Sequence, residues 1–245
     1  MQPKPFTALA EVYDAIMADV EYDAWTDFIL RLARARGLVE GPLLDLGCGT
    51  GNATAPMVER GLEVVGVDAS EAMLAVARRK LPRVRFHRAD FRRLRVPGRF
   101  GLVYSVFDAL NNLLEPSDFE AMARHVHRLL LPGGLFVFDM NTTVGLRDLW
   151  EGGRAEGWAG DVYYRWVHSY DEATGLARVE AFCESETGAF TEVHFERPYD
   201  PPELRTLLAA AGFEGVEAVS YASGRPAPPD AARVWVVARR PPAPP

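Results

Sequence analysis

The chain has 245 residues with an ordinary globular composition, 48% hydrophobic and 25% charged, which fits one large domain with an insertion or two small domains. No apolar run reaches the roughly 20 residues that a membrane span needs, and the segment 1–7 lacks the apolar stretch of a signal peptide. The net charge of −7 disfavours a nucleic-acid partner, which usually meets a basic surface. Cys48 and Cys183 form neither a disulfide framework nor a zinc pattern, so we expect a cytoplasmic protein with no metal site.

Strands and helices alternate along the first 140 residues. A turn signal, LPGG at 131–134, separates the last helix of this series from its last strand. Alternation at this spacing predicts a parallel sheet with helices on both faces, which is the doubly wound α/β fold. In chain order we expect a helical segment over 6–37, strands over 42–46, 62–67, 84–87, 100–106 and 135–140, and helices over 51–60, 70–81 and 116–131.

The pattern changes after residue 140. Three stretches rich in aromatic and β-branched residues, separated by short turn sequences, predict an antiparallel β insertion, and a helix and two strands then close the chain. The three insertion strands are expected over 161–170, 176–184 and 190–197, the helix over 202–211, and the closing strands over 215–221 and 233–238. The predicted domains are a core over 1–140 and 199–240 with a helical cap over 1–40, a substrate-covering insertion over 141–198, and a disordered tail over 241–245.

A glycine-rich loop, DLGCGTG at 45–51, follows the first predicted strand. Alternate glycines let the backbone turn tightly and let a ligand approach, while the loop amides and the next helix N-terminus offer donors and positive partial charge. A dinucleotide fold would show G-x-G-x-x-G, but Asn52 stands where the last glycine of that pattern belongs. The loop therefore favours a ligand with an ammonium, a carboxylate and a ribose but no pyrophosphate, and Asp45 is placed to meet the ammonium.

Two more carboxylates follow the next two predicted strands. Asp68 ends the second strand, where a carboxylate can accept both hydroxyls of a ribose, although a carboxylate here can also simply cap the following helix. Asp90 follows the third strand with Phe91 beside it, and together they can hold an adenine by its exocyclic amine and its ring face. The series predicts a site for a nucleoside that carries an amino-acid tail.

These motifs resemble a known family. The DLGCGTG loop, Asp68, the pair 90–91 and LPGG at 131–134 resemble, in order and spacing, the class I S-adenosylmethionine methyltransferases. The resemblance implies a seven-stranded, mostly parallel sheet whose last strand runs antiparallel. It also implies S-adenosyl-L-methionine as the cofactor and S-adenosyl-L-homocysteine as the product.

A narrower resemblance involves EVYDAIM at 11–17, YDAW at 22–25, FDALNNL at 107–113 and the spaced motif ExHxxRxY at 192–199. These segments look like those of the bacterial YqeM-like methyltransferases, a group similar to the N-methyltransferases of amino-sugar nucleotides. The resemblance implies that two N-terminal aromatic residues cover the cofactor and that Phe107 lies near the methyl group. The implied cofactor-binding residues are Tyr13, Trp25, Asp45, Gly47, Cys48, Gly49, Thr50, Gly51, Asp68, Ala69, Met73, Asp90, Phe91, Ser105 and Phe107.

The sequence indicates the residues that bind the methyl acceptor less clearly than those that bind the cofactor. Methyl transfer is an in-line displacement at an activated carbon, so the protein mainly positions the acceptor, and a base is needed only where the acceptor must lose a proton. Tyr13 and His194 are the candidate catalytic residues. The aromatic face of the predicted strand 161–170 is either a roof over the substrate or a packing surface. The candidate substrate-binding residues are Asn111, His168, His194, Arg197 and Tyr199.

An arginine-rich stretch over 78–99 is either a solvated surface or a phosphate-binding or RNA-binding edge. We expect a small-molecule acceptor that is methylated at nitrogen or oxygen. RNA or protein methylation, a non-catalytic S-adenosylmethionine-binding protein and a nicotinamide-dependent dehydrogenase remain alternatives. The sequence leaves open whether the protein is a monomer or a homodimer.

Overall fold

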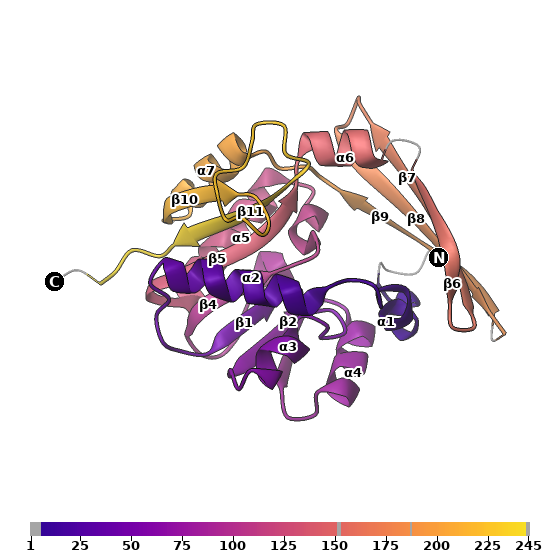
Figure 1. Ribbon diagram of the computed structural model, residues 1–245, viewed down its shortest axis with the longest axis horizontal. Helices are drawn as coiled ribbons and strands as arrows, with labels where there is room; N and C mark the ends of the chain where they lie inside the picture. Colours follow the sequence, from indigo (N-terminus) through magenta and orange to yellow (C-terminus); the bar gives the residue numbers. More distant parts are fainter. Residues whose placement is uncertain (1–5, 151–152, 187, 244–245) are drawn as a thin grey trace.

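The computed structural model describes residues 6–150, 153–186 and 188–243. It contains a seven-stranded sheet flanked by helices and a separate four-stranded sheet, which stands to one side of the first (Figure 1). Within the described part of the chain, no helix is long and apolar enough to cross a membrane.

The seven-stranded sheet has the order β10-β11-β5-β4-β1-β2-β3. β11 pairs antiparallel with both β10 and β5, while the pairs among β5, β4, β1, β2 and β3 are parallel, so the expectation of one antiparallel last strand is confirmed. The strands are β1 (Leu43–Leu46), β2 (Val64–Asp68), β3 (Arg85–Arg88), β4 (Phe100–Ser105), β5 (Leu130–Asn141), β10 (Glu214–Val219) and β11 (Arg233–Arg239).

Helices cover both faces of this sheet because each helix presents an apolar stripe to it. On one face, Phe119 and Met122 of α5 and Leu208 of α7 pack with the sheet, and on the other Phe28 of α2 and Met57 of α3 do so. Ser70 caps α4 by accepting a hydrogen bond from the Met73 amide, as its sequence predicted. The helices are α1 (Tyr13–Ile16), α2 (Tyr22–Ala35), α3 (Thr54–Glu59), α4 (Glu71–Lys80), α5 (Pro116–Leu129) and α7 (Pro201–Ala210), with short 3₁₀ turns η1 (Leu9–Glu11), η2 (Phe91–Arg93) and η3 (Ala109–Asn112).

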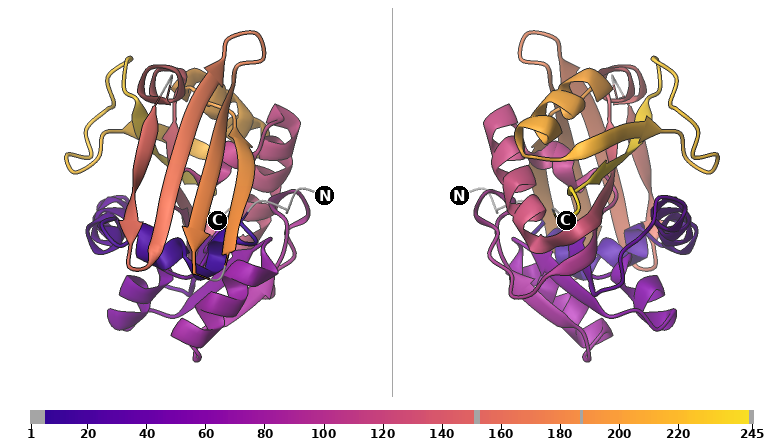
Figure 2. Two further views of the ribbon diagram at one scale, coloured as in Figure 1. Left: turned by 90° about the vertical axis from the view of Figure 1, so that its right-hand side faces the viewer. Right: turned by 90° about the vertical axis from the view of Figure 1, so that its left-hand side faces the viewer.

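The second sheet is the antiparallel insertion, and Figure 2 shows its four long strands face on. Its inner face is buried, because alternate residues of β8 such as Ala177 and Val179 are covered while their neighbours are more exposed. The elements are α6 (Thr143–Trp150), β6 (Arg154–Ala159), β7 (Val162–Asp171), β8 (Leu176–Ser185) and β9 (Gly188–Glu196).

The structure differs from the sequence expectation in three places. The predicted helical segment 6–37 is divided into η1, α1 and α2, and α6 and β6 were not predicted. The glycine in α6, Gly145, is required because an added Cβ would lie 2.0 Å from the Ala232 carbonyl oxygen. The LPGG segment lies inside β5 rather than before it, since Leu130 already pairs with Phe100. Of the predicted tail 241–245, residues 244–245 lie outside the described residues, as do 1–5 of the predicted cap.

Candidate active site

A cavity of 1240 Å³ lies between the carboxyl edge of the main sheet and the inner face of the antiparallel sheet. Its walls come from the glycine loop, the ends of β2 and β3, the turn after β4, and strands β7, β8 and β9. The N-terminal residues Phe6, Thr7 and Leu9 also line it. Of the residues predicted from the sequence, those lining the cavity are Tyr13, Asp45, Gly47, Cys48, Gly49, Thr50, Asp68, Ala69, Met73, Asp90, Phe91, Phe107, His168 and His194.

The glycine loop has a backbone that only glycine adopts easily. Gly47 and Gly49 have φ of +80° and +52°, in the left-handed region. An added Cβ at Gly47 would lie 3.0 Å from the Phe91 ring, whereas one at Gly49 would meet nothing within 4 Å. Gly49 therefore borders open space and lets the backbone face a ligand directly.

Asp68 supports this loop. One carboxylate oxygen accepts a hydrogen bond from the Gly49 amide at 2.9 Å and the other accepts from the Ser70 amide at 2.8 Å. Burial raises the pKa of Asp68, although both amide bonds oppose that rise. The carboxylate lines the cavity and each oxygen can accept a further bond, so it is positioned to bind ligand hydroxyls.

Asp45 carries a buried oxygen without a partner. Its side chain is 1% exposed, Oδ2 accepts a 2.6 Å hydrogen bond from Thr54, and Oδ1 has no hydrogen-bond partner among the described residues. Burial raises the pKa of Asp45 to about 7. A cationic amino group in the cavity would supply the missing partner.

Asp90 and Phe91 lie at the far side of the loop, after β3. The Asp90 carboxylate accepts hydrogen bonds from the Arg92 amide and guanidinium at 2.6 to 2.9 Å, and this guanidinium lowers the pKa of Asp90.

Cys48 packs beside Phe86 and Gly66, and burial raises the pKa of its thiol. This is the environment of a packing residue rather than of a nucleophile.

Comparison with known proteins agrees with this geometry. Residues 43–134, which include the glycine loop, match the model of a methyltransferase domain family. A crystal structure of an S-adenosylmethionine-dependent methyltransferase from Clostridium acetobutylicum superimposes with a TM-score of 0.83, at 25% identity, over 96% of this chain and 98% of that one. The chain is an S-adenosylmethionine-dependent methyltransferase.

Two sequence relatives extend the similarity along most of this methyltransferase. The putative methyltransferase YqeM of Bacillus subtilis is 29% identical over 85% of this chain and 86% of its own length. The dTDP-3-amino-3,4,6-trideoxy-alpha-D-glucopyranose N,N-dimethyltransferase of Streptomyces venezuelae is 27% identical over 89% of this chain and 93% of its own length. The similarity to the YqeM group and to amino-sugar N-methyltransferases, expected from the sequence motifs, is confirmed.

The cavity fits S-adenosylmethionine on three observations. The unpartnered Asp45 oxygen matches the ammonium of the amino-acid tail, the open space at Gly49 matches the close approach of the backbone, and Asp68 has acceptor capacity for ribose hydroxyls. These residues, with Asp90 and Phe91, would hold the cofactor. Among the described residues, no group of three or more histidine, cysteine or acidic side chains is arranged to hold a metal ion.

Three residues predicted to contact the cofactor do not line the cavity. Trp25 packs behind Phe107, with ring centroids 5.8 Å apart. Ser105 is buried and donates a 2.6 Å hydrogen bond to the Leu46 carbonyl, which ties β4 to β1. Gly51 turns toward α4 with φ of +83°. The structure assigns these residues to the support of the site.

Three predicted substrate residues also lie outside the cavity and join the insertion to the core instead. Asn111 donates a 2.8 Å hydrogen bond to the Arg197 carbonyl. The Arg197 guanidinium pairs with Glu203 at 2.9 Å and lies 4.4 Å from the centre of the Tyr199 ring. Tyr199 is fully buried, and its hydroxyl donates to the Leu113 carbonyl. Arg197 and Tyr199 of the spaced motif therefore lie outside the cavity lining.

His168, His194 and Tyr13 do line the acceptor side. Trp166 and His168 extend from β7 into the cavity wall, so the aromatic face of β7 forms part of a roof. Burial lowers the pKa of His194 to about 4, so its imidazole is neutral at neutral pH. Burial raises the pKa of Tyr13 well above its usual value, so its hydroxyl keeps its proton and acts as a hydrogen-bond donor.

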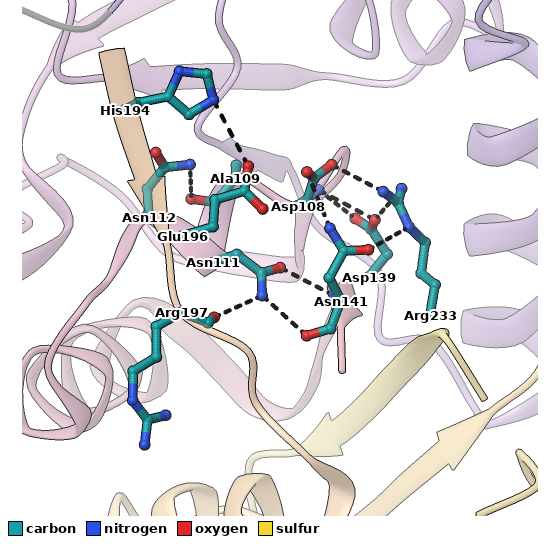
Figure 3. Close-up of polar contacts among 10 residues, drawn as sticks. All are labelled: Asp108, Ala109, Asn111, Asn112, Asp139, Asn141, His194, Glu196, Arg197 and Arg233. Carbon is teal, nitrogen blue, oxygen red and sulfur yellow. Dashed lines mark hydrogen bonds and ion pairs between the residues drawn. The ribbon is translucent and has the colours of Figure 1, made fainter. Parts of the chain in front are cut away.

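The structure adds a buried charge cluster that sequence reasoning missed (Figure 3). Phe107 and Asp108 both have positive φ, +61° and +49°, and the Asp108 amide donates to the Asp139 carboxylate at 3.2 Å. Arg233, at the start of β11, donates to Asp139 at 2.9 Å and to Asp108 at 3.1 Å, and Asn141 donates to Asp108 at 3.2 Å. The cluster holds the turn that places Phe107 in the cavity. An acidic residue at the end of β5 was a usable signal for Asp139, whereas nothing in the sequence pointed to Arg233.

The N-terminal segment closes the cavity through Glu192, which lies at an inward position of β9. Its carboxylate accepts hydrogen bonds from four consecutive amides, Phe6 to Leu9, at 2.5 to 3.1 Å. On the other side, Ser70 donates a 2.7 Å hydrogen bond to the Phe6 carbonyl. We call residues 6–9 the strap, because it joins α4 to β9 across the cavity.

Half of the ten basic side chains in the arginine-rich stretch 78–99 are paired with carboxylates. Five of its basic side chains form ion pairs, which spread over α1, α4 and the strands beside them. This pairing weakens the RNA-binding alternative. The pairs are Arg78–Glu71, Arg79–Glu11, Lys80–Asp14, Arg85–Glu63 and Arg92–Asp90, all at 2.5 to 2.7 Å.

Proposed function

We propose that this methyltransferase transfers a methyl group to a nitrogen or oxygen of a small molecule that binds between the two sheets. The observation that carries this proposal is the continuity of the cavity, which extends from the glycine loop to the inner face of β7, β8 and β9. Its volume of 1240 Å³ exceeds the roughly 300–1,000 Å³ of a common small-molecule pocket, which leaves room for an acceptor beside the cofactor.

Different residues of the chain then bind the cofactor, orient the acceptor and exclude water. When bound, S-adenosylmethionine supplies a methyl carbon on a positively charged sulfur, already activated for in-line displacement. Asp45, Asp68 and the glycine loop hold the cofactor, while Phe107 and Tyr13 border the space where the two halves of the cavity meet. The strap and the roof strands exclude water, so the acceptor is held in one orientation.

The relatives support a small acceptor. The Streptomyces venezuelae relative is named for methylating the amino group of a nucleotide-linked sugar, and its similarity covers most of both chains. The enclosed position of the acceptor half beneath the antiparallel sheet, together with the paired arginines at 78–99, favours a small molecule over an RNA or protein chain.

Transfer of a radiolabelled methyl group tests the proposal. The purified protein is incubated with methyl-labelled S-adenosylmethionine and, separately, with the small-molecule, RNA and protein pools of the organism that encodes it. We expect label in the small-molecule pool only, and less of it at a limiting cofactor concentration with the Asp68→Ala variant as a control. Label in RNA or protein would contradict the proposal, and so would the absence of label from all three pools.

A further inference from the structure

Glu196 is a buried carboxylate that faces the acceptor half of the cavity and has a free oxygen. It ends β9, on the same face as His194 and Glu192, and it lines the cavity. Its side chain is 3% exposed, and Oε2 has no hydrogen-bond partner within the described part of the chain. A buried acceptor of this kind is costly unless a ligand supplies the partner.

Neighbouring groups from each surrounding element do not provide a free cation. On β9, the His194 imidazole lies 3.8 Å from Glu196 Oε1 (Figure 3), but burial keeps its pKa near 4 and the ring neutral. On β11, the Arg233 guanidinium is occupied by Asp108 and Asp139. On β7, burial lowers the pKa of His168. Glu196 thus differs from the two aspartates of the cluster, which already have a positively charged partner.

The cavity as a whole is acidic. Among the described residues, its lining contains eight carboxylate side chains and three guanidinium groups. Two of the three guanidiniums are paired with carboxylates, Arg92 with Asp90 and Arg233 with two aspartates. The third, Arg88, donates to the Ala69 carbonyl at the end of β3, beside Asp68 in the sheet. The guanidinium that acts on Glu196 is Arg233, which is already paired with two aspartates, so among the described residues a cation is favoured beside Glu196 over a phosphate or carboxylate group.

We propose that Glu196 binds the methyl acceptor directly, and that this acceptor is a small amine that enters as a cation, with no phosphate or carboxylate close to its amino group. The assignment rests on the proposed function, which it narrows to one substrate class. It separates this chain from relatives that are named for nucleotide-linked sugars, because a diphosphate beside Glu196 would meet Arg233 already paired with two aspartates.

The Glu196 carboxylate can also accept the proton that the ammonium must lose before methyl transfer. One N–H bond of the bound ammonium breaks, an O–H bond forms on the carboxylate, and the nitrogen keeps the electron pair as the lone pair needed for attack. Burial raises the pKa of Glu196 above its usual value, and the nearby Asp108 carboxylate adds to the rise, which makes the ionised carboxylate a stronger base toward the bound ammonium.

Ion-exchange chromatography of the labelled product tests the substrate class. The small molecules labelled by the protein are passed over cation and anion exchangers at pH 7. We expect the label to be retained by the cation exchanger. Label retained by the anion exchanger, or by neither, would overturn the assignment while leaving the proposed function intact. No label in any small molecule would overturn both together.

The Glu196→Gln variant tests the residue with the amine that this chromatography yields. Glutamine keeps the size of the side chain and removes the charge, so the fold should tolerate it, which a thermal melt confirms. We expect the KM of the amine to rise at least tenfold and kcat to fall at least tenfold, while the Kd of S-adenosylhomocysteine changes less than twofold. Glu184→Gln, at an exposed position of the neighbouring strand β8, is the matched control and should leave all three unchanged. An unchanged KM for Glu196→Gln, or a loss confined to S-adenosylhomocysteine affinity, would overturn the assignment.

Discussion

Asp45 is the residue whose ionisation we expect to control cofactor affinity. Burial raises its pKa to about 7, and the ligand ammonium should bind only the ionised form. S-adenosylhomocysteine, which carries the same ammonium, should therefore bind about tenfold more weakly at pH 6 than at pH 8, because the ionised fraction of a group with that pKa falls about tenfold. Isothermal titration calorimetry at both values measures this ratio.

The Asp45→Asn variant supplies the control for this pH dependence, since it cannot ionise. In the cofactor-free protein, the raised pKa means that the Asp45 contribution to folding stability is present below pH ~4 and is lost as the pH rises toward 7. The variant should lack this loss and should bind S-adenosylhomocysteine weakly at both pH values. A variant with the wild-type pH dependence of binding would show that another group is responsible.

Asp68 is the second residue whose contribution to cofactor binding can be measured by itself. Replacing it by alanine removes a carboxylate that we expect to bind two ribose hydroxyls, and it also frees the Gly49 amide. We expect the binding free energy of S-adenosylhomocysteine to weaken by about 1–3 kcal/mol, because hydrogen bonds to a charged group are lost. Glu63→Ala, at an exposed residue just before the same strand, is the control. An unchanged Kd for Asp68→Ala would refute the ribose assignment.

At the scale of elements, the strap depends on Glu192. Four amides of residues 6–9 share one carboxylate, so Glu192→Ala should release the whole segment from β9 at once. Hydrogen–deuterium exchange followed by mass spectrometry should show at least tenfold faster exchange in the peptide that contains residues 6–9. Glu184→Ala serves as the control. Wild-type protection of that peptide in Glu192→Ala would mean that other contacts hold the strap.

The elements also show what could be predicted from the sequence. The sequence placed the glycine loop, Asp45 and Asp68 at one cavity, where the structure also has them, because local backbone geometry and a position at the carboxyl end of a strand decide their placement. Arg197 and Tyr199 were assigned to the substrate because their spacing matched a motif, yet spacing does not reveal which side of the chain faces the cavity. Glu196 was missed although it continues the alternation of Glu192 and His194, and Arg233 reaches its partners only through strand order, which is long-range.

On the scale of the whole molecule, the two sheets have different tasks. The main sheet presents the cofactor-binding loop at its carboxyl edge, and the antiparallel sheet covers the acceptor half of the same cavity. The join between them is packed and hydrogen-bonded, because Tyr199 is buried and Asn111 bridges η3 to the chain after β9. The acceptor therefore meets an acidic wall, while the strap is held to the antiparallel sheet by hydrogen bonds to one side chain, Glu192.

A crystal structure of the protein with S-adenosylhomocysteine tests this arrangement most directly. We predict that the ribose lies on Asp68, that the amino group of the tail lies at Asp45, and that the sulfur faces Phe107 and the space beneath β7, β8 and β9, toward Glu196. A ligand bound outside this cavity, or one whose sulfur points away from the antiparallel sheet, would contradict it.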